Sequence, residues 1–183
     1  TYANEVARRV RERHPDRGCG MFAYTFYNKP PLRIQKLEPN LYLSFVYQSA
    51  AFRDPENHAD WKQSVAGWQA LGASMVVREG WGNHYALDLP YLHYEQIATN
   101  LAEARRMGFV AAYGDGSKAF ATQAPNYWVL TRMLWDPARE PATVMDSFWR
   151  DAYGPVAAEM QAFFETYSRA LDRNWAARRK IVD

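Results

Sequence analysis

Short runs rich in β-branched and aromatic residues alternate along this chain with longer segments whose apolar residues recur every three to four positions. The short runs are 20–27 (GMFAYTFY), 41–47 (LYLSFVY), 73–78 (ASMVVR) and 109–113 (FVAAY). Runs of this kind predict strands, and the periodic segments predict helices. Strands that alternate with helices pair in parallel through right-handed crossovers, so we expect a fold of the α/β class.

Helical periodicity marks the rest of the chain. Tyr2, Val6 and Val10 recur every four residues among arginines and glutamates, which predicts an amphipathic helix at 2–14. Further helices are predicted at 58–71, 91–107, about 126–135, about 142–152, and 155 to beyond 175. The connection between the first two strands is too short for a full helix, so we expect these strands to be neighbours.

Two architectures fit about four parallel strands. A complete (β/α)8 barrel typically needs about 250 residues, so a chain of 183 residues would be half of one. The alternative is a small, open, doubly wound sheet. In both architectures the ligand site lies beyond the carboxyl ends of the strands, which directs attention to the residues that follow each strand.

Composition restricts the classes of partner. A formal net charge of +2, without a basic stripe, gives no support to nucleic-acid binding. No apolar stretch reaches the roughly 18 residues of a membrane span. The single cysteine, Cys19, forms neither a disulfide framework nor a zinc cluster and leaves the compartment open. Seven tryptophans and twelve tyrosines are a surplus of the residue types that line carbohydrate sites.

The residues expected at the strand ends combine carboxylates with aromatic and basic side chains. They are Tyr24, Tyr47, Arg53, Glu79, Trp81, His84, Tyr113 and Asp115. Carboxylates bind vicinal sugar hydroxyls, aromatic rings cover the apolar faces of sugars, and two carboxylates about 5 to 10 Å apart can cleave a glycosidic bond. We therefore take Glu79 and Asp115 as candidate catalytic residues and the other six as candidate substrate-binding residues.

Other acidic and aromatic residues of the chain are better explained by a structural role than by a function. Acidic residues in strand-to-helix loops, such as Asp54, Glu56 and Asp88, are usually solvated or cap a helix. Five tryptophans at helical spacing are better explained by core packing, namely Trp61, Trp68, Trp128, Trp135 and Trp175. The histidines show no metal-ligand spacing, and no phosphate-binding or nucleophile-elbow motif occurs, so we expect no metal and no cofactor.

Several short motifs, in order, resemble one known family. They are Ala23–Tyr27 with Pro30-Pro31, Leu37–Asn40, Glu79-Gly80-Trp81, Gly114-Asp115-Gly116, Leu130–Pro137 (LTRMLWDP) and Tyr153-Gly154. Each motif alone is weak, and their order and spacing over nearly the whole chain carry the likeness. The chain thus resembles the bacterial, glycoside-hydrolase-related family known as domain of unknown function 4838.

That resemblance implies a barrel similar to those of family 20 hexosaminidases and α-glucuronidases. The chain would be its C-terminal half, with half-barrel units over 1–137 and a helical extension packed on the barrel over 138–183. The principal acid of such barrels follows the fourth strand, which would precede this sequence. The strand-eight carboxylate that binds sugar hydroxyls matches Asp115, and Glu79 and Trp81 fall at the strand-seven rim.

Three functional hypotheses remain. The first is a glycoside hydrolase that cleaves a bacterial or plant glycan. The second is a domain that binds carbohydrate without cleaving it. The third is a structural or scaffold domain whose edges pair with the N-terminal half of the barrel or with another chain. The family resemblance, rather than the composition, favours an exported protein.

Overall fold

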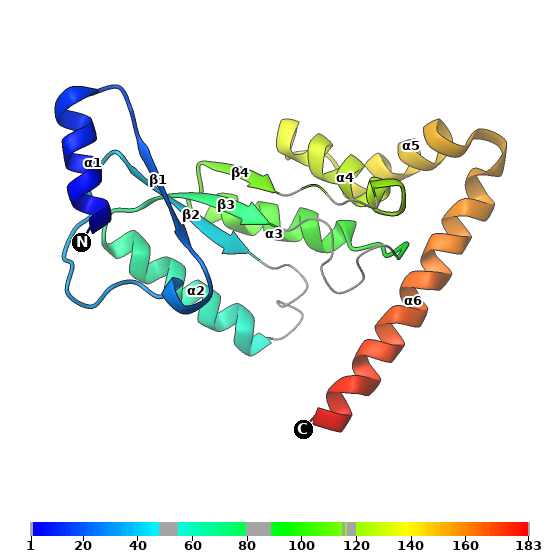
Figure 1. Ribbon diagram of the computed structural model, residues 1–183. Helices are drawn as coiled ribbons and strands as arrows, with labels where there is room; N and C mark the ends of the chain where they lie inside the picture. Colours follow the sequence, from blue (N-terminus) through cyan, green and yellow to red (C-terminus); the bar gives the residue numbers. More distant parts are fainter. Residues whose placement is uncertain (1, 48–54, 80–88, 115, 117–119, 183) are drawn as a thin grey trace. The chain divides into compact units, whose positions relative to one another are not determined.

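The computed structural model describes residues 2–47, 55–79, 89–114, 116 and 120–182, apart from the side chains of Tyr47, Glu79 and 175–182 (Figure 1). Its sheet consists of β1 (Cys19–Ala23), β2 (Leu41–Tyr47), β3 (Ser74–Glu79) and β4 (Ala111–Gly114). The four strands are parallel and lie in the order β1-β2-β3-β4. The predicted α/β class is therefore confirmed, as is the pairing of the first two strands.

The helices follow the predicted order with shifted ends. They are α1 (Tyr2–Arg13), α2 (Pro55–Ala70), α3 (Tyr94–Arg106), α4 (Phe120–Trp135), α5 (Pro141–Tyr153) and α6 (Ala157–Val182), with 3-10 turns η1 (Thr25–Tyr27) and η3 (Gly154–Val156). Helix α4 begins six residues before its predicted start, and Pro125 is fully buried within it. Gly72 and Gly108, with φ near +80°, follow α2 and α3 as the sequence predicts.

The chain divides into two compact units, residues 1–80 with 104–114 and residues 81–103 with 115–183. In the first unit, one face of the sheet carries the core. Its members come from β1, β2, β3, α1, α2, the end of α3 and the loop before β2: Ala7, Ala23, Leu37, Leu41, Leu43, Phe45, Trp61, Val65, Trp68, Met75, Val77 and Ala104. Burial of Trp61 and Trp68 confirms the prediction that they pack in a core.

The strand order and the placement of the core bear on the choice between the two architectures. A doubly wound sheet reverses its strand order and carries helices on both faces. Here the order rises without reversal, and buried residues of α1, α2 and α3 (Ala7, Trp61 and Ala104) join one core cluster on one face of the described sheet. This arrangement is the one found between neighbouring strands of a (β/α)8 barrel, and it is consistent with half of such a barrel.

Helix α1 packs through its small residues. Ala7 is fully buried and Ala3 packs against the same core. The stripe of Tyr2, Val6 and Val10 lies outside that core cluster, and Tyr2 is 86% exposed. The helix is amphipathic as predicted, but its larger apolar residues are not the ones that fix it to the sheet.

The second unit has its own core between α4, α5 and α6. The largest buried side chains there are Phe148, Trp149 and Phe164, and Trp128 packs partly buried against them. The predicted burial of Trp135 is wrong, because this side chain at the end of α4 is 90% exposed. The side chain of Trp175 lies outside the described residues.

A set of hydrogen bonds fixes the segment that leads into α3 within the second unit. The Tyr91 hydroxyl donates to Asp172 Oδ1 at 2.7 Å, and the Leu92 amide donates to Ser168 Oγ at 2.8 Å. From α4, Asn126 Nδ2 donates to the Tyr91 carbonyl at 2.7 Å. Side chains from α4 and α6 thus hold this segment and satisfy polar groups along it.

Candidate functional site

The carboxyl ends of three strands lie level in the sheet. Tyr47 of β2 is in register with Glu79 of β3, which is in turn in register with Gly114 of β4. Because the strands are parallel, their carboxyl ends share one edge of the sheet (Figure 1). The backbone at Tyr47 and Glu79 therefore lies at the edge where the sequence predicts a site.

Side chains alternate between two faces of this sheet. Phe45 and Val77, which are in register, are buried on the face that α2 covers. The residues between them on each strand belong to the opposite face, which we call the open face. Its described members are Phe22, Tyr42, Ser44, Val46, Val76, Arg78, Ala111 and Tyr113, and Phe22, Tyr42 and Tyr113 are exposed.

Two contacts extend across the open face. The Ser44 and Tyr113 hydroxyls lie 2.5 Å apart, which joins β2 to β4 over the intervening strand. The Arg78 guanidinium carbon of β3 lies 5.6 Å from the centre of the Phe22 ring of β1, a cation–π contact. Hydroxyl, aromatic and cationic groups therefore meet on one surface.

The row of the open face nearest the carboxyl edge contains Val46, Arg78 and Tyr113, which are in register. Tyr24 directly follows β1 and is 38% exposed. Along β3, Glu79 stands in the alternating set of Met75 and Val77, and Arg78 stands in the opposite set. The structure thus brings Tyr113 and Arg78 together and assigns Glu79 to the neighbouring position on the edge.

Six of the eight predicted site residues have no described side chain. Arg53, Trp81, His84 and Asp115 lie outside the described residues. For Tyr47 and Glu79 the structure gives the backbone position only. Tyr24 and Tyr113 are the predicted site residues whose side chains are described, and both are partly accessible to solvent.

Sequence reasoning missed Ser44, Arg78 and Phe22. Arg78 is the last residue of the predicted strand 73–78, and an arginine at the end of a strand is easily interpreted as a solvated group. Alternation within MVVRE already separates Arg78 from Met75 and Val77. The contacts with Phe22 and the row with Tyr113 required the register, which a single strand does not reveal.

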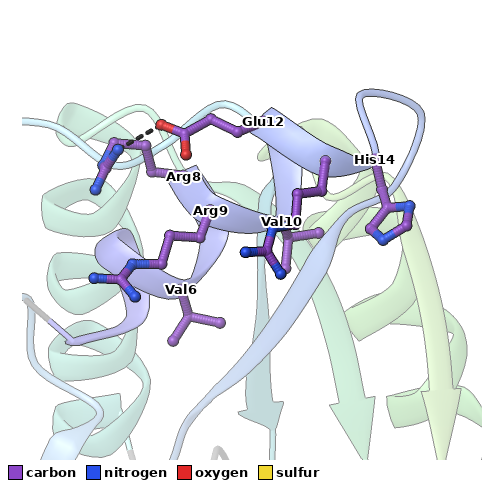
Figure 2. A pocket seen from close by; sticks show the side chains of 7 residues that line it. Val6, Arg8, Arg9, Val10, Glu12 and His14 are labelled. Atoms are coloured by element: carbon purple, nitrogen blue, oxygen red, sulfur yellow. Dashed lines mark hydrogen bonds and ion pairs between the residues drawn. The ribbon is translucent and has the colours of Figure 1, made fainter.

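A hollow of about 610 Å³ lies beside α1, away from the carboxyl edge. Val6, Arg8, Arg9, Val10, Glu12, Arg13 and His14 line it. Figure 2 shows Val6, Arg9 and Val10 directed to the same side of the helix, with Arg8 paired to Glu12. Every lining residue comes from one short stretch, so the hollow is a surface beside a helix and has no converging catalytic groups.

Two further findings concern only the part of the chain that the structure describes. Within it, no three His, Cys, Asp or Glu side chains gather closely enough to hold a metal ion. None of its helices combines the length and the apolar character that crossing a membrane requires.

Comparison with known proteins gave one result. Residues 1–166 match the model of the family described as "Domain of unknown function (DUF4838)". The comparisons with curated proteins and with solved structures found no match. Since the family model spans most of the chain, this protein belongs to the DUF4838 family.

Proposed function

We propose that the chain is a carbohydrate-active domain, similar to half of a glycoside-hydrolase barrel, with its glycan site at the carboxyl ends of the four strands. The observation that carries this proposal is the row of Val46, Arg78 and Tyr113 beside Tyr24 at that edge. Parallel sheets bind ligands at this edge. Aromatic rings that adjoin hydroxyl and guanidinium donors suit a ligand with apolar faces and many hydroxyls.

Most glycosidases cleave the glycosidic bond with two carboxyl groups. One protonates the oxygen of the leaving sugar, while the other attacks the anomeric carbon or removes a proton from the attacking water. We assign these roles to Glu79 and Asp115. Glu79 is in register with Gly114, the residue that immediately precedes Asp115 in the sequence. We assign binding of the substrate to the other six candidates, namely Tyr24, Tyr47, Arg53, Trp81, His84 and Tyr113.

Variants of the two carboxylates test the catalytic assignment. On a panel of nitrophenyl glycosides, Glu79→Gln and Asp115→Asn should each lower kcat/KM by about 10²- to 10⁴-fold, the usual contribution of an acid–base group. Glu56→Gln is the matched control, because Glu56 lies exposed in the first turn of α2. Equal activity of all three variants and the parent would refute the assignment.

A binding domain without catalysis is the alternative within the same proposal. It predicts no turnover of any glycoside by the parent, together with measurable binding of glycans. Tyr113→Leu should weaken that binding, because it removes the aromatic ring that Tyr113 contributes to the row nearest the edge. Turnover by the parent that Glu79→Gln removes would exclude this alternative.

A pairing domain is the second candidate, and the exposed apolar surface of the first unit favours it. Parallel sheets ordinarily have both faces covered, yet Phe22, Tyr42 and Tyr113 of the open face are exposed. The stripe of Tyr2, Val6 and Val10 also lies outside the core cluster of this unit. The partner would be the N-terminal half of a barrel or another chain.

Sedimentation equilibrium of the chain by itself tests pairing. Concentration-dependent association that Phe22→Asp abolishes would support it. Leu32→Asp, at an exposed position outside the sheet, is the control. A monomer at all concentrations, with no tendency to aggregate, would count against the half-barrel arrangement, because unpaired parallel edge strands associate readily.

A further inference from the structure

The turn after β1 presents aromatic side chains to solvent at the carboxyl edge of the sheet. We call residues 24–28 the aromatic turn. Phe26 is 99% exposed and Tyr27 is 56% exposed, and Tyr24 precedes them. A fully exposed phenylalanine beside two accessible tyrosines forms an exposed apolar surface. Covering such a surface with a ligand lowers the free energy.

The backbone of the aromatic turn is held in a conformation that its sequence disfavours. Thr25 has φ of +46°, and it is the one residue other than glycine with positive φ in the described part of the chain. A β-branched residue in the left-handed region is an outlier. Such conformations persist where the surrounding structure imposes them, and they concentrate at binding sites.

Contacts with α2 anchor the end of the aromatic turn and the two residues that follow it. The indole N–H of Trp68, a buried residue, donates to the Asn28 carbonyl at 2.7 Å. Pro30 lies so close to Gly67 that a Cβ at that position would approach Pro30 Cγ to 2.6 Å. Lys29 also forms an ion pair with Asp60. Three contacts with one helix therefore anchor the chain at residues 28–30, directly after the aromatic rings, which stay outside the core.

We propose that the aromatic turn binds sugar units of a glycan chain that extends from the strand-end site, so that the ligand is an oligosaccharide or polysaccharide rather than a single sugar. This inference rests on the proposed function. A rigid aromatic surface loses little conformational freedom on binding, and flat rings match the apolar faces of successive sugar rings. Tyr24 and Tyr27 add hydroxyl groups for the hydroxyls at the rims of those faces.

The position of the turn supports an extended ligand. Tyr24 is adjacent to Ala23, the last residue of β1, and β1 is an edge strand of the sheet. The aromatic turn therefore begins at the β1 side of the sheet, whereas Tyr113 belongs to β4, three strands away or about 14 Å at the usual strand spacing. A single sugar at that row would leave Phe26 uncovered, whereas a chain of several sugars reaches both surfaces.

Calorimetric titration with saccharides of different length tests the inference. The probes are chitohexaose and chitobiose, xylohexaose and xylobiose, and cellohexaose and cellobiose. The parent should bind one hexasaccharide at least tenfold more tightly than its disaccharide. Phe26→Ala should weaken binding of that hexasaccharide about fivefold, the value of a typical aromatic contact, and leave the disaccharide unchanged.

Trp135→Ala is the matched control, because Trp135 is an equally exposed aromatic residue in the second unit. It should bind both saccharides as the parent does. Circular dichroism should show every variant folded, since the side chains of Phe26 and Trp135 are outside the core.

Two negative results have different meanings. Equal affinity of the parent for the hexasaccharide and the disaccharide, with no effect of Phe26→Ala, would overturn the role of the aromatic turn and leave the proposed function intact. Failure of the parent to bind any of the six saccharides would count against the proposed function, and this inference would fall with it.

Discussion

The hydroxyl of Tyr113 lies 2.5 Å from that of Ser44, on the strand two places away in the sheet. Ser44 is almost fully buried although it belongs to the open face, because the Tyr113 ring extends over β3 and covers it. The contact ties β4, an edge strand of four residues, to the centre of the sheet. It therefore links the stability of the edge strand to the geometry of the proposed site.

A double-mutant cycle should detect this link. Tyr113→Phe leaves the Ser44 hydroxyl without its partner and should lower the free energy of unfolding by about 1 to 2 kcal/mol. Ser44→Ala should cost less, and the double variant should cost less than the sum of the two. Tyr42→Phe, on the same face, is the control. Urea titrations that show additive effects would contradict the hydrogen bond.

Replacing Thr25 by glycine should stabilise the folded protein. The left-handed conformation costs a residue with a Cβ about 1 to 2 kcal/mol, and glycine adopts it freely. Glycine also makes the unfolded chain more flexible. The entropic cost of folding therefore rises by about 0.5 to 1 kcal/mol, which offsets part of the gain. We expect a net increase of up to about 1 kcal/mol in the free energy of unfolding, measured by urea titration.

Thr25→Ala serves as the control for this substitution. Alanine keeps the Cβ and hence most of the strain, so it should give a smaller change than glycine. If the two variants change the free energy of unfolding equally, the backbone at this position is not strained.

The strands could be predicted because the residue composition that favours a strand is contained within a short segment of the sequence. Leu41–Tyr47 alternates large apolar and other residues between turn signals, and its predicted bounds match β2. The first strand is shorter than predicted, because the aromatic run that follows Ala23 turns at Thr25 instead of continuing. High β propensity there reflects exposed aromatic residues of a turn, which composition alone does not distinguish from a strand.

The core was less predictable, because residue size does not decide which face of a helix is buried. On α1 the small residues Ala3 and Ala7 pack on the core, while Val6 and Val10 lie outside it. Small side chains allow a helix to approach a sheet closely. Trp135 shows the same limit, since helical spacing from Trp128 places it on a related face but does not say where the core ends.

From the sequence, the residues of the candidate site could be predicted for each strand separately, but not their alignment across strands. Each strand end could be found in the sequence, but the row of Val46, Arg78 and Tyr113 depends on how the strands are aligned. A shift of one residue in that alignment would have placed Glu79 in the row instead of Arg78. Tertiary pairing fixes such alignments, so the contribution of Arg78 appears only in the structure.

Ionisation of Tyr94 should make the second unit less stable at alkaline pH. Burial, with a smaller contribution from the nearby Glu95, raises the pKa of Tyr94 above its ordinary value of 10.0. The folded state therefore holds this proton more tightly than the unfolded state does. The corresponding stability is complete below pH 10 and is lost as the pH rises from about 10 through the pKa of the folded state.

Thermal unfolding between pH 8 and pH 11 measures this effect. In Tyr94→Phe the fall of the melting temperature above pH 10 should be less steep than in the parent. Burial also raises the pKa of Tyr153, so the double variant with Tyr153→Phe should show a still shallower fall. An unchanged slope in Tyr94→Phe would show that this hydroxyl is not desolvated in the folded state.

Asn126 is fully buried and satisfies three polar groups at once, so its replacement should strongly destabilise the second unit. Its Nδ2 donates to the Tyr91 carbonyl at 2.7 Å and to Gln123 Oε1 at 2.9 Å, while its Oδ1 accepts from the His93 amide at 3.0 Å. Asn126→Ala leaves these partners unpaired and opens a cavity. We expect a loss of about 3 kcal/mol or more in the free energy of unfolding.

Asn126→Asp distinguishes the loss of the donor from the loss of volume. An ionised carboxylate at this position faces two acceptors, the Tyr91 carbonyl and Gln123 Oε1, so only its protonated form can restore a donor. The pKa of the introduced carboxyl should rise in the folded state, and stability should then increase as the pH falls from 7 to 4. Asn126→Ala should lack this additional gain at low pH. If the two variants respond to pH alike, the side chain serves only to fill space.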